Sequence, residues 1–192
     1  MNPFDLTEIL RNHTVYIQTH NFPDPDAISS AFGLQQFLAC HGIHAMLCYD
    51  GKIDRLSAKK MLDTFGISMH SIEELPDMAA EDFIVLVDAQ KHNSNVTDFI
   101  GDEVACIDHH PIFFHTDYLY QDIRKVGACA SIIASYYHST DTPISPSCAA
   151  ALAYGIKMDT ADFNRGATAL DIEMLSFLFC RADWGMVTSM YT

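Results

Sequence analysis

The sequence predicts an α/β fold: a three-layer, doubly wound and mostly parallel sheet with helices on both faces. Three observations lead to this expectation. Short apolar runs alternate along the chain with longer segments of helical periodicity. The strand-like runs are apolar on both faces, which is typical of strands buried between layers of helices. The 192 residues, 49% of them hydrophobic, are enough for one domain with a substantial core.

The first elements are a strand, a helix and a second strand. Residues 13–20 (HTVYIQTH) form an apolar run that ends in a histidine. In residues 27–42 apolar side chains recur every three or four positions, and Gly42 follows the last turn, so we expect a helix that ends there. Residues 44–50 (HAMLCYD) are again short and apolar. A poorly patterned stretch follows, with a short helix expected near 57–65.

The clearest strand of the chain is 82–89 (DFIVLVDA), and 103–111 (EVACIDHHP) is another, with a short helix or turn between them. Residues 129–140 (CASIIASYYHST) have helical periodicity. The Ser-Pro pair at 145–146 supplies an N-cap and a proline at the first helical position, which predicts a further helix. A last amphipathic helix is expected over about 168–180.

The composition limits the classes of partner. The chain carries 25 acidic against 11 basic residues, a net charge of −14. A surface this acidic repels the phosphate backbone, so we expect no binding of long nucleic acids by this chain alone. A small anionic substrate stays compatible with the charge if cations occupy its site.

Two further features bear on location. The six cysteines include no C-x-x-C pair, and we interpret Cys40, Cys129 and Cys180, which lie in apolar, helix-like runs, as small buried residues in a reducing compartment. The N-terminal residues lack the basic and apolar regions of a signal peptide, and no apolar run reaches membrane-spanning length. We therefore expect a cytoplasmic protein that does not contact membranes.

Acidic and histidine side chains follow three of the expected strands at the point where each ends. They are His20, Asp24 and Asp26 after the first strand, Asp88 after 82–89, and Asp108, His109 and His110 after 103–111. Because the carboxyl ends of parallel strands meet at one edge of a sheet, we expect these side chains to lie close together. Asp159 follows a helix, and this argument does not place it.

The chemistry of this set points to metal. Several carboxylates cannot share one pocket without protons or cations. Carboxylates and imidazoles without cysteine suit Mn²⁺ better than structural Zn²⁺, with Mg²⁺ or Co²⁺ as alternatives. The set exceeds what one ion needs and fits two ions about 3.5–4 Å apart that share a carboxylate, an arrangement used for displacement at phosphorus.

Each of these residues also has a structural explanation. The alternatives are an N-cap at Asp26, a turn at Asp24, a cap at Asp88 and surface histidines at 109 and 110. The small residues 127–131 (GACAS) either allow close packing or let a phosphate reach backbone N–H groups, with Ser131 as a candidate phosphate contact.

With these residues identified, the sequence resembles the DHH phosphoesterase superfamily. The segments HNFPDPDAISSAFGL, VDAQ, IDHHP and YGIKMDTADF resemble the four ordered motifs of that superfamily, and GACASIIASYY resembles the helix after its DHH loop. Its members include inorganic pyrophosphatases, exopolyphosphatases, oligoribonucleases and 3′-phosphoadenosine-5′-phosphate phosphatases. The resemblance covers nearly the whole chain.

The resemblance implies a role for each residue. One metal ion is held by His20, Asp24 and Asp88, and a second by Asp26, Asp88, His109 and Asp159. Asp88 bridges the two ions, and His110 faces the substrate phosphate as a charge stabiliser or proton donor. Asp108 supports the catalytic loop from behind.

Relatives of this kind usually continue into a C-terminal substrate-binding domain that this sequence does not resemble. We therefore expect residues 1–192 to be the catalytic domain alone, either as a fragment or as a single-domain member. The expected function is manganese-dependent hydrolysis of phosphate esters or anhydrides in small substrates, such as short oligonucleotides or nucleotide phosphomonoesters. The alternatives are an inorganic pyrophosphatase or exopolyphosphatase, a non-catalytic metal- or nucleotide-binding module, and an α/β domain whose acidic residues are only caps and turns. A homodimer is compatible with each of these.

Overall fold

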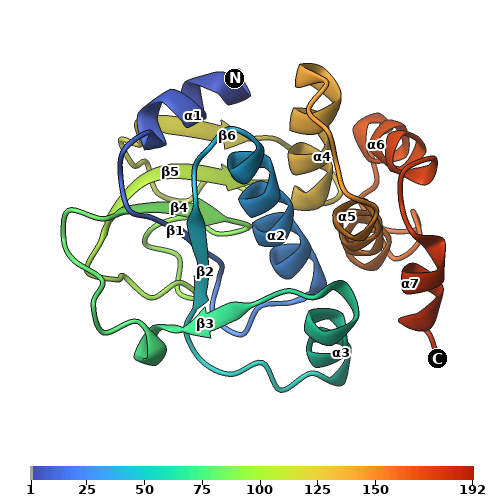
Figure 1. Ribbon diagram of the computed structural model, residues 1–192, viewed down its shortest axis with the longest axis horizontal. Helices are drawn as coiled ribbons and strands as arrows, with labels where there is room; N and C mark the ends of the chain where they lie inside the picture. The colour runs from blue at the N-terminus through green and yellow to red at the C-terminus, as the bar shows by residue number, and fades with distance from the viewer. Residues whose placement is uncertain (1) are drawn as a thin grey trace.

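Six parallel strands form one sheet at the centre of a computed structural model that describes residues 2–192 (Figure 1). The elements in chain order are α1 (Pro3–Leu10), β1 (Val15–Gln18), α2 (Pro25–Cys40), β2 (Ala45–Tyr49), α3 (Leu56–Phe65), β3 (Met69–Ser71), the 3₁₀ helix η1 (Ile72–Glu74), β4 (Phe83–Val87), β5 (Asp102–Asp108), β6 (Tyr120–Ile123), α4 (Cys129–Thr140), α5 (Pro146–Asp159), α6 (Ala169–Phe179) and α7 (Trp184–Ser189). None of the helices within residues 2–192 has the length and apolar character needed to cross a membrane.

The strand order brings the loops after β1 and β4 next to each other. The order across the sheet is β3-β2-β1-β4-β5-β6, and every neighbouring pair is parallel. The chain builds outward from β1 to β3 on one side, then returns to β4 and builds outward to β6 on the other. The direction of winding therefore changes between β1 and β4, and in such sheets the crevice beyond the carboxyl ends of these strands is the usual ligand site.

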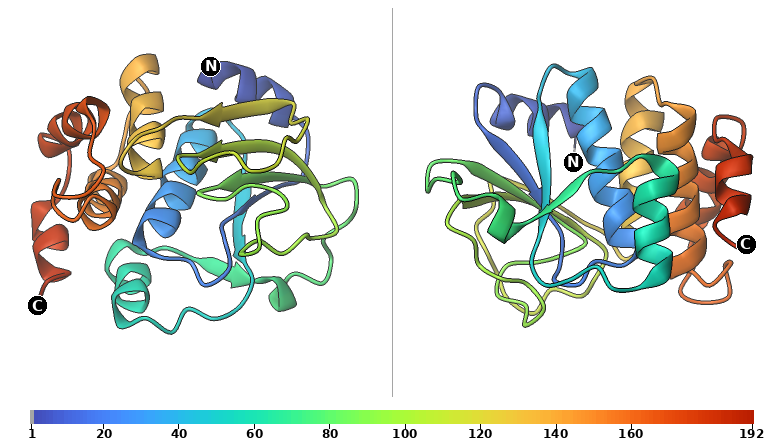
Figure 2. Two further views of the ribbon diagram at one scale, coloured as in Figure 1. Left: turned by 180° about the vertical axis from the view of Figure 1, so that it is seen from behind. Right: turned by 60° about the horizontal axis from the view of Figure 1, so that its bottom comes forward.

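The two faces of the sheet are covered differently (Figure 2). The larger core lies on the face covered by α2, α4 and α5, and the smaller core on the other face includes Tyr16, Ile84 and Phe99. The α/β class and the parallel sheet predicted from the sequence are confirmed. On the second face the cover consists of η1 and loops, because the segments that lie there, 72–82 and 90–101, contain proline, asparagine and aspartate in place of helical periodicity.

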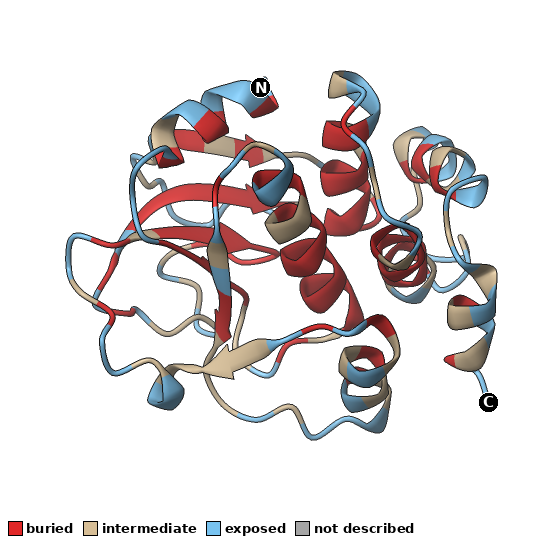
Figure 3. Ribbon diagram, in the orientation of Figure 1, coloured by how far each residue is buried: buried red, intermediate tan, exposed pale blue. Residues whose placement is uncertain are grey.

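The helical side is tightly packed around α5. Residues 148–156 of this helix are all buried, and α2 is buried along most of its length (Figure 3). Gly155 is needed at the crossing, because an added Cβ there would lie 2.0 Å from Ser29 Oγ. This close approach holds the end of α5, with Asp159, near the start of α2, with Asp26.

The structure adds elements that the sequence patterns did not predict. These are α1, β3, β6 and α7. The two strands have only three and four residues, and β6 (YQDI) mixes polar and apolar side chains, so neither gives an apolar run. The segment between β4 and β5 contains turns and no helix.

Candidate metal centre

The acidic and histidine residues after β1, β4 and β5 converge at the carboxyl edge of the sheet, and the last residue of α5 joins them. Three groups have ligand atoms within 4.8 Å of one another. They are His20, Asp24 and Asp88; Asp26, His109 and Asp159; and Asp88, Asp108, His109 and His110. The first two groups match the two ligand sets that the family resemblance implies, with Asp88 between them.

Asp88 is the centre of the cluster. Its Oδ2 lies 3.6 Å from His20 Nε2, and its Oδ1 lies 3.3 Å from His109 Nε2. The side chain is only 2% exposed, and within residues 2–192 its Oδ1 has no hydrogen-bond partner. Its backbone φ of +55° lies in the left-handed region, which is uncommon for aspartate and frequent at functional sites. A buried carboxylate oxygen without a donor fits a site built for a cation.

Both histidines that flank Asp88 are oriented as metal ligands usually are. His20 Nδ1 donates to the carbonyl of Asn21 at 2.9 Å, and His109 Nδ1 donates to the carbonyl of Val126 at 3.1 Å. Because a carbonyl can only accept, each bond places the proton of the neutral ring on Nδ1. Both Nε2 atoms, which face the carboxylates, then carry a free lone pair.

The two aspartates of the first motif each cap a different helix. Asp24, not Asp26, is the N-cap of α2, and its Oδ1 accepts from the backbone N–H groups of Asp26 at 3.0 Å and Ala27 at 3.1 Å. Asp26 accepts from the N–H groups of Cys129 at 2.7 Å and Ala130 at 2.9 Å, at the start of α4. A carboxylate can therefore cap a helix and lie in the cluster at the same time. The N-cap of α2, expected at Asp26, is Asp24.

Asp159, which the strand argument did not place, lies at the end of α5. Its Oδ2 is 3.4 Å from His109 Nε2, so it belongs to the group of Asp26. Arg165 donates to the Asp159 carbonyl at 2.6 Å and to Oδ1 at 3.1 Å. The guanidinium fixes Asp159 from the solvent side while Oδ2 stays turned toward His109.

The pKa shifts in the cluster show that its carboxylates favour a nearby positive charge or a bound proton. Burial lowers the pKa of His20, but Asp24 and Asp88 outweigh burial and raise it to about 11. Burial also opposes protonation of His109, yet Asp88 and Asp26 raise its pKa to about 10. Burial, together with the charge of Asp88, raises the pKa of Asp26 well above its usual value. Without metal, protons compensate the carboxylates, and a divalent cation is the natural replacement for them.

The pKa values of Asp24 and Asp159 shift in opposite directions. Burial favours the neutral form of Asp24, but its contacts with His20 and the N–H groups of α2 outweigh this and lower its pKa to about 2. Burial and the nearby carboxylates raise the pKa of Asp159, with His109 acting against them. One side of the cluster therefore holds a stable carboxylate, and the other holds a carboxylate that a cation would stabilise.

His110 and Asp108 form a pair beside the cluster. His110 Nδ1 lies 2.9 Å from Asp108 Oδ1, and this hydrogen bond, against the effect of burial, raises the pKa of His110. Asp108 is fully buried, and its other oxygen accepts from Gln90 Nε2 at 2.6 Å. The half-exposed ring of His110 is thus held by a buried carboxylate, as expected for Asp108 behind the loop.

Gln90 is a residue that the sequence interpretation missed. Its amide also donates to the carbonyls of His110 at 3.1 Å and Pro111 at 3.4 Å, so it joins the loop after β4 to the loop after β5. The sequence signal that could have identified Gln90 is its position in VDAQ, directly after the clearest strand.

The expectation that Ser131 contacts a phosphate is wrong. Ser131 is fully buried, and its Oγ donates to Asp171 Oδ1 at 2.6 Å. The N–H groups of Cys129 and Ala130 bind Asp26, so they are not free for a phosphate either. The small residues at 127–131 serve close packing: a Cβ on Gly127 would lie 2.7 Å from Thr160 Cγ2.

The residues present fit a pair of divalent ions by three criteria. The donor set consists of carboxylates and imidazoles, the tautomers are fixed, and one central carboxylate oxygen is buried without a partner. Cys129, whose N–H group binds Asp26, has a thiol pKa raised well above its usual value by burial, so it stays protonated and is a poor metal ligand.

Comparison with known proteins gives consistent similarities. The chain is 33% identical to an uncharacterised protein of Methanocaldococcus jannaschii over 175 residues, which covers 90% of this chain and 36% of that protein. It is 28% identical to a manganese-dependent inorganic pyrophosphatase of the same organism, covering 83% of this chain and 52% of that protein. The chain thus spans about a third to a half of the length of these relatives.

A solved structure shares the fold. An exopolyphosphatase-related protein from Bacteroides fragilis superposes with a TM-score of 0.75 at 17% identity, covering 96% of this chain and 58% of that one. A sequence model of the DHH family, N-terminal domain, matches residues 14–156, which is most of the chain and includes every candidate ligand except Asp159. The chain therefore belongs to the DHH family.

Proposed function

We propose that this chain is the metal-binding part of a manganese-dependent hydrolase that cleaves phosphate esters or anhydrides. His20, Asp24 and Asp88 would hold one ion, and Asp26, Asp88, His109 and Asp159 the other. The observation that carries the proposal is the position of Asp88, whose two oxygens face the Nε2 atoms of two histidines with fixed tautomers. The 28% identity to a manganese-dependent pyrophosphatase supports manganese as the metal.

The chemistry divides between the ions and the chain. When bound, two divalent ions supply an activated water and stabilise the charge that develops at phosphorus. Asp88 would contribute one carboxylate oxygen to each of the two ion sites. The bond to Asp108 raises the pKa of His110, which favours the charged ring, and a charged ring would present a proton at Nε2 beside the phosphate. Gln90 and Asp108 keep that ring in place.

The substrate we favour is small. The net charge of −14 disfavours long polyanions. Short oligonucleotides and nucleotide phosphomonoesters fit this description. Inorganic pyrophosphate is the second candidate, favoured by the similarity to pyrophosphatases.

The test is a substrate panel read together with metal content. We expect the purified chain to bind Mn²⁺ by elemental analysis and to hydrolyse at least one of pyrophosphate, a chromogenic phosphodiester, a dinucleotide and a nucleoside monophosphate. Asp88→Asn is the matched inactive control. Binding of Mn²⁺ and nucleotide without any turnover would favour the non-catalytic module, and failure to bind Mn²⁺ would overturn the proposal.

A further inference from the structure

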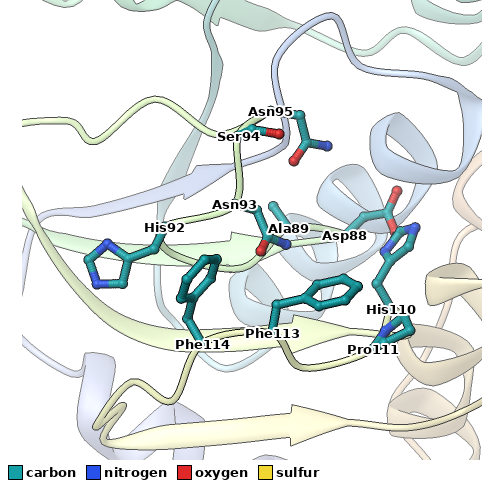
Figure 4. A pocket seen from close by; sticks show the side chains of 10 residues that line it. All are labelled: Asp88, Ala89, His92, Asn93, Ser94, Asn95, His110, Pro111, Phe113 and Phe114. Atoms are coloured by element: carbon teal, nitrogen blue, oxygen red, sulfur yellow. The ribbon is translucent and has the colours of Figure 1, made fainter.

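A cavity of about 430 Å³ opens directly beside the metal centre, and most of the residues that line it are not among the proposed metal ligands. Asp88 and His110 lie at one end of it, and the loops after β4 and β5 form its walls (Figure 4). Its volume falls within the range of roughly 300–1,000 Å³ that is usual for small-molecule sites. Whatever occupies it is adjacent to the reacting phosphate.

Aromatic rings line this cavity. Phe113 is 72% exposed and Phe114 52% exposed, although both are large apolar side chains on adjacent positions of one loop. His92 lies across from Phe114, with ring centroids 6.2 Å apart in an edge-to-face arrangement. Figure 4 shows the Phe113 ring between Phe114 and His110, so an aromatic surface extends from the wall to the catalytic end. Exposed rings grouped in this way are typical of a binding surface.

Amides and a hydroxyl line the remaining wall, and none of the lysines and arginines within residues 2–192 lines this cavity. Asn93, Ser94 and Asn95 offer donors and acceptors along the loop after β4. Lys91, which precedes them, is turned away, because its Nζ binds Glu103 Oε2 at 2.6 Å. Arg55 and Arg165 line a separate hollow with Asp24 and Asp159, and Lys125 lines another beside His109 and His110. The cavity therefore suits a neutral, flat, hydrogen-bonding group and not a further phosphate.

The cavity is held open by hydrogen bonds. Gln90 links its two walls, as described above. Asn21 N donates to the carbonyl of Asn95 at 2.7 Å, and Asn21 Nδ2 donates to Thr97 Oγ1 at 2.9 Å. These bonds fix the loop after β4 to the loop after β1, so a ligand would find the walls in place.

We propose that this cavity binds the nucleoside of a nucleotide whose phosphate lies at Asp88 and His110. The base stacks on Phe113 and Phe114, and the asparagine amides contact its edge and the sugar. This assignment rests on the proposed function, and it separates the two substrate classes left open there. A nucleotide uses the aromatic cavity, whereas inorganic pyrophosphate has nothing to place in it.

The experiment compares AMP with ribose 5-phosphate, which carries the same phosphate and sugar without the base. Binding to the full chain is measured calorimetrically with Mn²⁺ present. Ligand-detected saturation-transfer NMR with Mg²⁺ then reports which protons of AMP touch the protein. The test variant is Phe113→Ala/Phe114→Ala. The matched control is Phe179→Ala, which removes another exposed phenylalanine from the end of α6.

We expect AMP to bind at least about tenfold more tightly than ribose 5-phosphate, since stacking of one base is worth roughly fivefold to a hundredfold in affinity. The double variant should remove this difference and leave ribose 5-phosphate within twofold, and the control should change neither. Saturation should be strongest at the base protons of AMP.

The proposal is overturned if AMP and ribose 5-phosphate bind equally, if the base protons receive no saturation, or if the double variant weakens both ligands alike. Failure of the proposed function gives a different result, because Mn²⁺ content and pyrophosphate hydrolysis are measured on the same samples. If the chain binds metal and cleaves pyrophosphate but shows no preference for the base, the proposed function stands and the nucleoside site is refuted.

Discussion

The two sides of the metal centre are built from different kinds of structure. We call the start of α2, the start of α4 and the end of α5 the helical wall, and the loops 88–97 and 110–114 the loop wall. In the helical wall Asp26 is buried and accepts two N–H groups of α4. In the loop wall the phenylalanines at 113 and 114 are exposed, and the backbone is held by side-chain amides.

This difference separates two tasks. The helical wall places charged groups with an accuracy that close packing provides, as at Gly155, where no Cβ fits. The loop wall shapes an open cavity in which a ligand replaces solvent. Fixed geometry suits the proposed ligands Asp24, Asp26 and Asp159 at the helix ends, whereas accessible surface suits contacts with a substrate.

The largest effect should come from Asp88, the loop-wall residue whose carboxylate faces both His20 and His109. Asp88→Asn keeps the left-handed backbone, which asparagine tolerates, and removes only the charge. We expect hydrolysis to fall by about a thousandfold or more and the content of both ions to fall, because the two sites share this carboxylate. Elemental analysis and steady-state kinetics measure these changes. Asp159→Asn should affect one ion only, and full metal content in Asp88→Asn would refute the bridging role.

Binding of Mn²⁺ should raise the free energy of unfolding of the chain. At a hundred times its Kd, an ion that binds only the folded chain adds about 2.7 kcal/mol to the free energy of unfolding. For a chain of this size this corresponds to a rise in Tm of roughly 5–10 °C. Thermal unfolding with Mn²⁺ and with a chelator measures it, and Asp88→Asn is the control. Hydrogen exchange should slow around the proposed ligands at the start of α2, the end of α5 and the loop after β4, and unchanged exchange there would contradict the metal site.

Asp171, on α6, supports the helical wall at the start of α4, and we expect its effect on stability to depend on pH. This buried carboxylate accepts from Ser131 Oγ at 2.6 Å, Gly127 N at 2.9 Å and Thr168 N at 2.6 Å, which tie α6 to the start of α4. Burial raises its pKa, but these donors outweigh burial and lower it. Asp171→Asn should cost about 2 kcal/mol at neutral pH, because hydrogen bonds to a charged group are lost.

The sign of the pH effect follows from the lowered pKa. The stabilisation by ionised Asp171 is present above its unfolded value of about 3.9 and is lost as pH falls through the lower folded value. The difference in unfolding free energy between the parent chain and Asp171→Asn should therefore be constant above about pH 5 and shrink below pH 4. Denaturant unfolding at several pH values measures it, and a difference that grew in acid would contradict the interpretation.

The sequence was most informative where local signals and sheet topology agreed. Apolar runs predicted β1, β2, β4 and β5, and the rule that strand ends converge brought Asp88 and His109 together correctly. It failed where partners are distant in sequence. The bond from Cys129 N to Asp26 spans 103 residues, and no local pattern reveals that α4 is capped from α2. Ser131 was misassigned for the same reason, since its partner Asp171 lies 40 residues away.

The loop wall was the least predictable region, because its shape depends on hydrogen bonds between polar side chains of three loops. The residues 90–97 (QKHNSNVT) carry turn-forming types but no periodicity, and a short helix or turn was expected between the flanking strands. The hydrogen bonds of Gln90, Asn21 and Thr97 hold this segment in place as a wall of the cavity.

The smallest expected effect tests this wall directly. Thr97 Oγ1 donates to Asp50 Oδ2 at 2.6 Å and accepts from Asn21 Nδ2 at 2.9 Å, so Thr97→Val removes both bonds at nearly constant shape. We expect a loss of about 1 kcal/mol in unfolding free energy, with faster hydrogen exchange in residues 92–97 and unchanged Mn²⁺ content.

Thr188→Val is the matched control, because Thr188 Oγ1 bonds only within its own helix, to the carbonyl of Trp184. If the loop wall is a separate unit, Thr97→Val should weaken AMP binding a fewfold, by loosening the cavity, while the control does not. Faster exchange spread equally over α4 and α5, or loss of metal from Thr97→Val, would mean that the two walls are one cooperative structure. Local loosening with an intact metal centre would mean that the ligand surface can vary while the metal-binding geometry stays fixed.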